Sequence, residues 1–235
     1  MRTASIFAVL LLLIALDCGC ATRSDESGPV DTSFSAGPVR VRRRLESWKT
    51  IREKGIVMQS YDFSCGSAAL ATLMRYYFQD DVTEREVLEN MLNALTDEQV
   101  RQRQENGLTM LDLKQCAERM GYQAVGVRLE PKILPQLQGP MLIHLQRQGY
   151  KHFAVLRGVR GDRAYVADPS SGNVRLPMSR FLRQWTNVAL VLGKPGVGLP
   201  TDYPLAVSED WAVHDAMLAP VASRYLLPDS GAVAP

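Results

Sequence analysis

The first half of the chain places apolar residues at the three-to-four-residue spacing of amphipathic helices, and the clearest case runs from Cys65 to Phe78. Ser64 comes just before this stretch and is a suitable N-cap residue, because a serine hydroxyl can accept a hydrogen bond from the first helical turn. We therefore predict a helix over Cys65 to Phe78. The apolar residues on its buried face are Ala69, Leu70, Leu73, Met74 and Tyr77.

Three further helix starts follow in the sequence. Thr83 with Glu86 and Thr96 with Gln99 are capping boxes, in which two side chains satisfy the free N–H groups of a helix start, and Thr109 with Asp112 opens a third helix. We expect the first helix to end near Leu95, the second at Asn106-Gly107, and the third at Gly121, which suits a C-terminal cap.

After Tyr122 the pattern changes to the two-residue alternation of β-strands. Tight turns are expected at residues 160–162 and 168–172, and short helices at residues 131–137 and 179–185. Because helices come first and hairpin-connected strands follow, we predict an α+β fold whose N-terminal helices pack on an antiparallel sheet. The predicted strands cover residues 122–129, 141–145, 152–159, 163–168, 174–176 and 187–194.

The N-terminus has the features of a secretory signal peptide over residues 1–21. A positive start at Arg2 is followed by an apolar run from Ile6 to Leu16 and by small residues up to Ala21. The apolar run is shorter than the about 20 residues that a membrane-spanning helix needs. Two alternatives stay open: cleavage after Ala21, or attachment of a lipid to Cys20 that would tether the protein to a membrane.

The rest of the chain is expected to hold one domain with two tails. Residues 22–45 are predicted to form a flexible linker, residues 46–194 the domain, and residues 195–235 a Pro- and Ala-rich C-terminal tail. The formal net charge of +2 includes the basic run Arg40–Arg44 and argues against a nucleic-acid-binding protein. This run suits a solvated edge near anionic lipid, with docking of a substrate or partner as the alternative.

Removal of the signal peptide would leave Cys65 and Cys116 as the cysteines of the domain. They could form a disulfide in an oxidising compartment, but Cys116 falls mid-helix beside Leu113 and Ala117 and is interpreted as a core residue. Cys65 begins a helix, where unpaired N–H groups and the helix dipole favour a thiolate, and Gly66 leaves the sulfur accessible. The sequence therefore indicates Cys65 as a candidate nucleophile.

A cysteine nucleophile needs a base, and imidazole can both take and return a proton near neutral pH. His152 begins a predicted strand at a sheet edge, whereas His144 suits a sheet interior and His214 lies in the tail. Asp168 ends the next strand, so a hairpin of the two strands makes His152 and Asp168 neighbours, as the orienter of a base should be.

Gln59 precedes Cys65 by six residues. Its amide, together with the backbone N–H of Cys65, could stabilise the oxyanion that nucleophilic attack creates. We expect neither a cofactor nor a metal, because the three histidines are scattered and no Cys-x-x-Cys pair remains after the predicted signal peptide.

The motifs QSYDFSCGSAAL, HFAVLRGV and VADPSSG occur in this order between Gln59 and Gly193. In this order and spacing the chain resembles the bacteriocin-processing double-glycine peptidases, papain-like cysteine peptidases best known as N-terminal domains of peptidase-containing ABC exporters. The resemblance implies a papain-like fold with Cys65 as nucleophile, His152 as base and acid, Asp168 as orienter and Gln59 as oxyanion donor. The family usually carries an acidic residue just before the nucleophile, where this chain has Ser64.

The leading hypothesis is a stand-alone, secreted cysteine endopeptidase that cleaves an exported protein or peptide in the periplasm, next to small residues. Relatives associated with envelope export make a role beside adhesin or functional-amyloid secretion machinery an expectation, with a lipid anchor in the outer membrane as an option. Two alternatives stay open: a module that binds the export substrate without cleaving it, and an acyl or amide transferase with the same triad.

Overall fold

The computed structural model describes residues 30–36, 39–147 and 149–207. These form parts of two compact units, one up to Ser47 and one from Trp48 onward. The expected signal peptide over residues 1–21 lies outside the described residues. None of the helices in the described part combines the length and the apolar character needed to cross a membrane.

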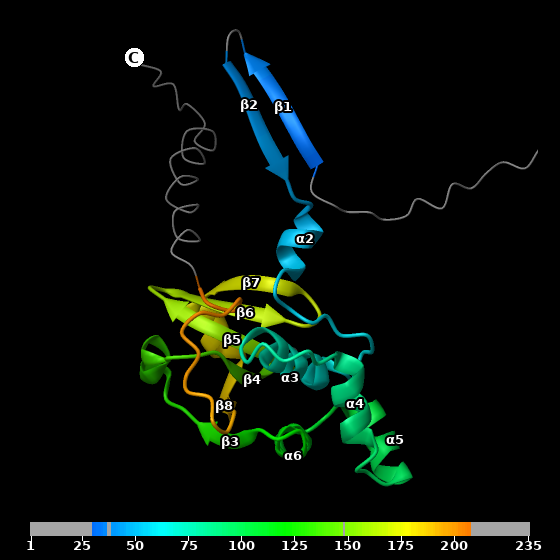
Figure 1. The fold of residues 1–235 in the computed structure, drawn as a ribbon. Helices are drawn as coiled ribbons and strands as arrows, with labels where there is room; N and C mark the ends of the chain where they lie inside the picture. Colours follow the sequence, from blue (N-terminus) through cyan, green and yellow to red (C-terminus); the bar gives the residue numbers. More distant parts are fainter. Residues whose placement is uncertain (1–29, 37–38, 148, 208–235) are drawn as a thin grey trace, which may run out of the picture. The chain divides into compact units, whose positions relative to one another are not determined.

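The first unit contains a two-stranded antiparallel hairpin of β1 (Val30–Ala36) and β2 (Val39–Leu45), with Val30 opposite Leu45 (Figure 1). The expectation of a linker over residues 22–45 is therefore wrong for these two segments. The physical reason is visible in the sequence, since residues of high strand propensity alternate with polar residues on both sides of a Gly-Pro pair.

The second unit begins with helices, and the predicted helix starts are confirmed. All three expected pairs, including Thr109 with Asp112, form reciprocal capping boxes. Ser64 occupies the N-cap position of α3 but its hydroxyl does not cap that helix, and α2 was not predicted. The helices are α2 (Trp48–Glu53), α3 (Cys65–Tyr76), α4 (Glu84–Leu92), α5 (Asp97–Asn106) and α6 (Met110–Arg119).

A six-stranded antiparallel sheet follows, in the order β3-β8-β4-β5-β6-β7, so the predicted α+β class is confirmed. The expected short helices are also present, the first of them as a 3₁₀ helix. The elements are β3 (Gln123–Arg128), η1 (Pro131–Gln136), β4 (Met141–Arg147), β5 (Tyr150–Arg160), β6 (Arg163–Asp168), β7 (Gly172–Pro177), α7 (Met178–Gln184) and β8 (Trp185–Gly193).

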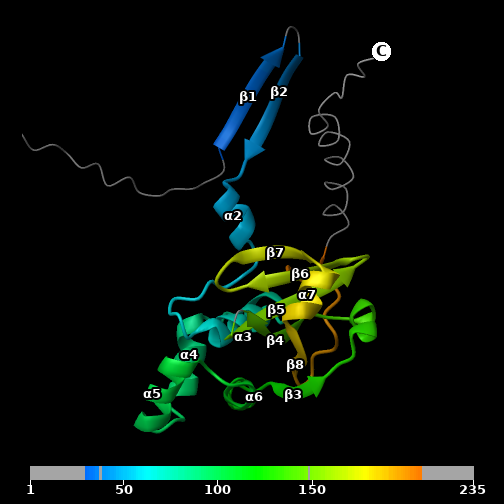
Figure 2. The ribbon, with the colours of Figure 1, turned by 180° about the vertical axis from the view of Figure 1, so that it is seen from behind.

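Helices cover both faces of this sheet. α3 lies in front of it in Figure 1, and α7 lies in front when the molecule is seen from behind in Figure 2. One core joins α3, α4 and α6 to sheet residues such as Phe153 and Val155, and the other joins α7 to residues such as Leu156 and Val166. Since α3 sits on the middle of the sheet, its first residue lies close to β5.

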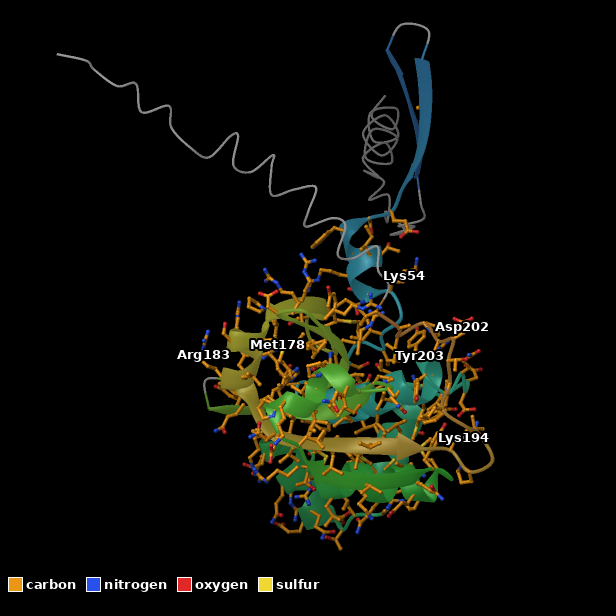
Figure 3. All side chains as sticks on the ribbon, turned by 90° about the vertical axis from the view of Figure 1, so that its left-hand side faces the viewer. Lys54, Met178, Arg183, Lys194, Asp202 and Tyr203 are labelled. Atoms are coloured by element: carbon orange, nitrogen blue, oxygen red, sulfur yellow. The ribbon has the colours of Figure 1, made fainter. Side chains whose placement is uncertain are left out.

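The start of the expected C-terminal tail packs on the domain. Leu205 is fully buried, and the rings of Tyr203 and Tyr77 meet edge to face. The buried guanidinium of Arg157 donates hydrogen bonds to the carbonyls of Pro204, Leu205 and Ala206. Figure 3 shows Tyr203 on the opposite side of the sheet from Met178 and Arg183 of α7. The domain therefore extends beyond the predicted boundary at residue 194.

Candidate active site

Cys65 is the first residue of α3 and is buried. The next residue must be small, because a Cβ atom at Gly66 would lie 2.9 Å from Leu113 Cδ2 and 3.2 Å from Phe153 Cδ2. The Cys-Gly pair thus lets the start of α3 approach α6 and β5 closely, and it brings the thiol to the sheet.

His152 and Asp168 are brought together by the hairpin of β5 and β6, as the sequence predicted. Val155 lies opposite Ala167 in the register, and the Nε2 atom of His152 is 2.9 Å from Oδ1 of Asp168. Cys65 is a close neighbour of His152, and its hydrogen-bonding and electrostatic interactions raise the pKa of the imidazole. Because Nε2 faces Asp168, Nδ1 is the ring nitrogen left for the sulfur. The three side chains therefore form one contact line.

This line of contacts shifts two pKa values. Burial lowers the pKa of His152, but hydrogen bonds with Asp168 and Cys65 raise it, and the net result is a pKa of about 9. Burial raises the pKa of Asp168, while hydrogen bonds from His152 and Ser170 lower it, so that it lies well below the usual range of a carboxyl group. At neutral pH the arrangement favours a proton on the imidazole beside an ionised carboxylate.

Arg147 was missed by the sequence reasoning. Its Nη1 donates to Oδ2 of Asp168 at 2.8 Å, and its Nε donates to Oε1 of Gln184 at 3.1 Å. Asp168 is fully buried, and its other oxygen also accepts from the backbone and hydroxyl of Ser170. A usable signal was the register of the β4–β5 hairpin, where Leu145 lies opposite His152 and Arg147 follows two residues later.

The backbone of Gln59 is hydrogen-bonded to the turn that follows Asp168, since the N–H of Gln59 donates to the carbonyl of Pro169 at 3.0 Å. Its side-chain Nε2 donates to the carbonyl of Tyr61 at 3.0 Å. Oε1 is buried and has no hydrogen-bond partner within the described residues. An amide nitrogen carries two hydrogens, so the second N–H of Gln59 is available to a bound molecule.

His144 and Cys116 lie in the sheet and in the core, as predicted from the sequence. His144 lies half-buried in β4, where Nδ1 is 3.0 Å from Oγ1 of Thr186, as expected for a sheet histidine. Cys116 is fully buried, 3.6 Å from the carbonyl oxygen of Val87. Both Cys65 and Cys116 are free, so the disulfide alternative is wrong. The described residues contain no cluster of three or more metal-binding side chains.

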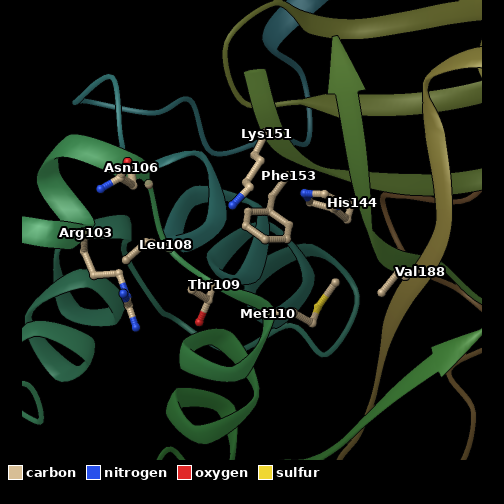
Figure 4. A pocket seen from close by; sticks show the side chains of 10 residues that line it. Arg103, Asn106, Leu108, Thr109, Met110, His144, Lys151, Phe153 and Val188 are labelled. Atoms are coloured by element: carbon tan, nitrogen blue, oxygen red, sulfur yellow. The ribbon is translucent and has the colours of Figure 1, made fainter. Parts of the chain in front are cut away.

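A pocket of about 320 Å³ lies beside this site (Figure 4). Its apolar wall includes Leu108 and Phe153, which also contact the position of Gly66. Phe153 and Lys151 flank His152 in β5, and Figure 4 shows the ammonium of Lys151 at the pocket. The other lining residues are Arg103, Asn106, Gly107, Thr109, Met110, His144 and Val188.

The sequence model of the peptidase C39 family matches residues 53–195. The chain belongs to the peptidase C39 family. It is accordingly a cysteine peptidase, and the family resemblance inferred from the sequence is confirmed.

Several known proteins are similar to this chain over more than half of its length. A probable functional amyloid protease, FapD, of Pseudomonas aeruginosa is 34% identical over 192 residues, which are 82% of this chain and 80% of FapD. FapD of Pseudomonas fluorescens is 35% identical over 72% of this chain and 74% of its own length. The lactococcin-G-processing and transport ATP-binding protein LagD of Lactococcus lactis is 27% identical over 58% of this chain and 18% of LagD.

A solved C39 structure confirms the fold. The peptidase domain of Streptococcus ComA, described as a bifunctional ABC transporter of a quorum-sensing pathway, superposes with a TM-score of 0.51. It shares 19% identity and covers 59% of this chain and 97% of that domain. The predicted papain-like architecture, helices packed on an antiparallel sheet, is thus the fold of a C39 peptidase domain.

Proposed function

We propose that this chain is an endopeptidase of the cell envelope that cleaves an exported protein through Cys65, His152, Asp168 and Gln59. The observation that carries the proposal is the contact line from the Cys65 thiol through the His152 imidazole to the buried Asp168 carboxylate. Peptide-bond cleavage by a thiol needs a nucleophile, a proton carrier and an orienting group in that order. The contact line supplies each of them in sequence.

The first half of the reaction forms an acyl-enzyme. The sulfur of Cys65 adds to the carbonyl carbon of the scissile bond, and the electron pair of the C=O double bond moves to the oxygen. The C–N bond then breaks, and the leaving nitrogen takes the proton that His152 holds. With its pKa raised to about 9, the imidazole of His152 retains that proton at neutral pH until the amine accepts it.

The second half releases the product. A water molecule gives a proton to His152 as its oxygen adds to the thioester carbon, and the C–S bond breaks to restore the sulfur of Cys65. Asp168 keeps Nε2 of His152 engaged during both halves, so that the other ring nitrogen stays directed at the reacting atoms. The proton taken from water restores the starting state of the imidazole.

Gln59 and the start of α3 are suited to hold the negative oxygen. The backbone N–H of Cys65 belongs to the first helical turn, where N–H groups lack acceptors within the helix. One N–H of Gln59 is fixed by the carbonyl of Tyr61, and the second can donate to the substrate oxygen. Two such donors stabilise the charge that develops on the oxygen in the transition state.

The pocket supports a substrate with an apolar side chain near the cleavage site. The walls of Leu108, Met110 and Phe153 would enclose that side chain, and the ammonium of Lys151 would favour an acidic neighbour on the substrate. Small residues next to the cut remain our expectation. The similarity to functional amyloid proteases supports an exported amyloid-forming protein, or a component of its secretion machinery, as substrate.

The proposed place of action is the periplasm. The support is the sequence of residues 1–21, which has the features of a secretory signal peptide, with attachment of a lipid to Cys20 as the anchored form. The mass of the N-terminal peptide of the mature protein distinguishes the two forms. The anchored form begins at a diacylated Cys20, whereas cleavage after Ala21 gives a mature protein that begins at an unmodified Thr22.

The test compares cells that produce the wild-type protein with cells that produce Cys65→Ala, and it maps new protein N-termini in the envelope by mass spectrometry. Cys116→Ala is the matched control, because it removes the other free thiol of the described domain, which faces the carbonyl of Val87 rather than His152. We expect one set of N-termini to vanish only in Cys65→Ala. Identical sets in all three strains would contradict the proposal and leave substrate binding as the function.

A further inference from the structure

Glu84 is a buried carboxylate that faces the loop before the nucleophile. It is the first residue of α4, and only 7% of the residue is exposed. The hydroxyl of Ser60 donates to its Oε2 at 2.6 Å, and the backbone N–H of Ser60 lies 3.0 Å from both carboxylate oxygens. The hydroxyl of Ser64 donates to Oε1 at 2.6 Å. Within the described residues, the hydrogen bonds of this side chain thus all go to the segment that joins Gln59 to Cys65.

Hydrogen bonds within the same segment connect Ser64, through Tyr61, to the side-chain amide of Gln59. Oγ of Ser64 accepts from the backbone N–H of Tyr61 at 3.1 Å, and the backbone N–H of Ser64 donates to the carbonyl of Tyr61 at 3.1 Å. That carbonyl also accepts the Nε2 hydrogen of Gln59 at 3.0 Å. Glu84 therefore connects to Gln59 through Ser64 and Tyr61, in three consecutive hydrogen-bonded steps.

A buried carboxylate is costly to keep unless its environment compensates it. Within the described part of the chain no salt bridge is found for Glu84, in contrast to Asp112 and Asp168. The compensation comes from the hydroxyls of Ser60 and Ser64, the backbone N–H of Ser60, and the positive end of the α4 dipole. Charge-assisted hydrogen bonds of this kind are short and directional, so they set the position of the loop more strictly than packing alone.

We infer that Glu84 is a positioning residue for the oxyanion site. It holds residues 60–64 in place, so that the side-chain amide of Gln59 and the backbone N–H of Cys65 point to the same substrate oxygen. This inference rests on the oxyanion role proposed above for these two donors. The hydrogen bonds of Glu84 do not reach the His152–Asp168 pair, whose partners are Cys65 in α3, Arg147 in β4 and Ser170 in the turn after β6. Its loss should therefore impair stabilisation of the oxyanion and spare the nucleophile.

Two small probes separate these effects in the full-length protein. Iodoacetamide alkylates the sulfur by displacing iodide, a reaction that forms no oxyanion, so its rate reports on Cys65 and His152. N-acetylglycylglycinal reacts reversibly with Cys65: a C–S bond forms, the C=O electron pair moves to the oxygen, and this oxygen is held by the oxyanion donors. The concentration of aldehyde that protects Cys65 from iodoacetamide thus measures the oxyanion site.

The variants are Glu84→Gln, which keeps the shape but places an N–H₂ group against the Ser60 donors, and Ser64→Ala, which removes the next link. Glu86→Gln is the matched control, because it makes the same change two residues later at the exposed capping box of α4. We expect both test variants to be alkylated at the wild-type rate but to need at least about tenfold more aldehyde for protection. Glu86→Gln should match the wild type in both measurements.

The inference is overturned if the aldehyde protects Glu84→Gln and Ser64→Ala as well as the wild type. It is also overturned if their alkylation slows as much as in His152→Ala, because Glu84 would then support the whole site. A wild-type protein that the aldehyde fails to protect, although its Cys65 is alkylated rapidly, would contradict the proposed oxyanion site itself. Thermal unfolding curves of each variant show whether a slow reaction reflects an unfolded protein.

Discussion

The Nε2 atom of His152 lies 2.9 Å from Oδ1 of Asp168, and this hydrogen bond joins the start of β5 to the end of β6. The carboxylate is fully buried, and the imidazole side chain is 14% exposed. The carboxylate is thus shielded from solvent, while part of the imidazole stays accessible. Four consequences of this geometry and of its surroundings can be measured.

Asp168→Asn should leave the fold intact and lower kcat by about four orders of magnitude, as loss of the orienting charge does in other triads. The asparagine amide can still face His152, but it no longer stabilises the imidazolium or fixes the tautomer. Steady-state kinetics with the substrate identified by N-terminal mapping measures the effect. A variant with wild-type kcat would remove Asp168 from the catalytic group.

The stability of the fold should depend on pH through His152. Its pKa is raised from 6.5 to about 9 in the folded protein, so its ionisation stabilises the fold fully below pH 6.5. This contribution is lost as the pH rises through about 9. The free energy of unfolding from urea titrations, wild type minus His152→Gln, should therefore fall between these two values. The comparison with the variant cancels the titration of other groups.

A difference that stays constant across this range would contradict the raised pKa of His152. A difference that grows with pH would mean that the imidazole is held in its neutral form, which reverses the sign of the effect. Either result would change the protonation state assigned to the resting site.

Arg147→Ala should lower kcat by about tenfold to a hundredfold, because Oδ2 of the buried Asp168 carboxylate loses its donor and the carboxylate gains freedom to turn. Arg147→Lys should lie between, since it keeps the charge and loses the bond to Gln184. Arg163→Ala removes a more exposed arginine from β6 and is the matched control. Equal kcat values for Arg147→Ala and Arg163→Ala would show that Arg147 has no positioning role.

Met110→Trp should raise KM by about tenfold or more and change kcat little, because the larger ring fills the pocket beside the site. Leu111→Trp is the control, since Leu111 is 59% exposed on the same helix and does not line the pocket. A kcat decrease without a KM change would place the pocket outside the substrate-binding surface.

The local features of the fold were predictable from the sequence. Capping boxes depend on residues three positions apart, and a hairpin needs only two alternating segments around a turn, so the helix starts and the contact of His152 with Asp168 could be inferred. The hairpin of β1 and β2 was missed because its Ser, Gly and Asp content resembled a linker.

The supporting residues could not be found in this way. Ser64 was expected to cap α3, but its hydroxyl instead bonds to Glu84, which is 20 residues away, and Arg147 reaches Asp168 across 21 residues. No periodic pattern links such pairs, since each depends on where two separate elements meet in space. Residue type alone did not distinguish Glu84 from the exposed glutamates of the same helix.

The hydrogen bonds of Arg157 have a consequence for where the folding unit ends. The family match stops at residue 195, yet three acceptors of this buried guanidinium are the carbonyls of Pro204, Leu205 and Ala206. Asn173 accepts from the same guanidinium and donates to the carbonyls of Arg52 and Lys54, so one buried cation joins the two ends of the domain. A chain cut after residue 195 would leave the buried guanidinium of Arg157 without these three acceptors. The folded catalytic domain therefore includes residues 204–206, beyond its last β-strand.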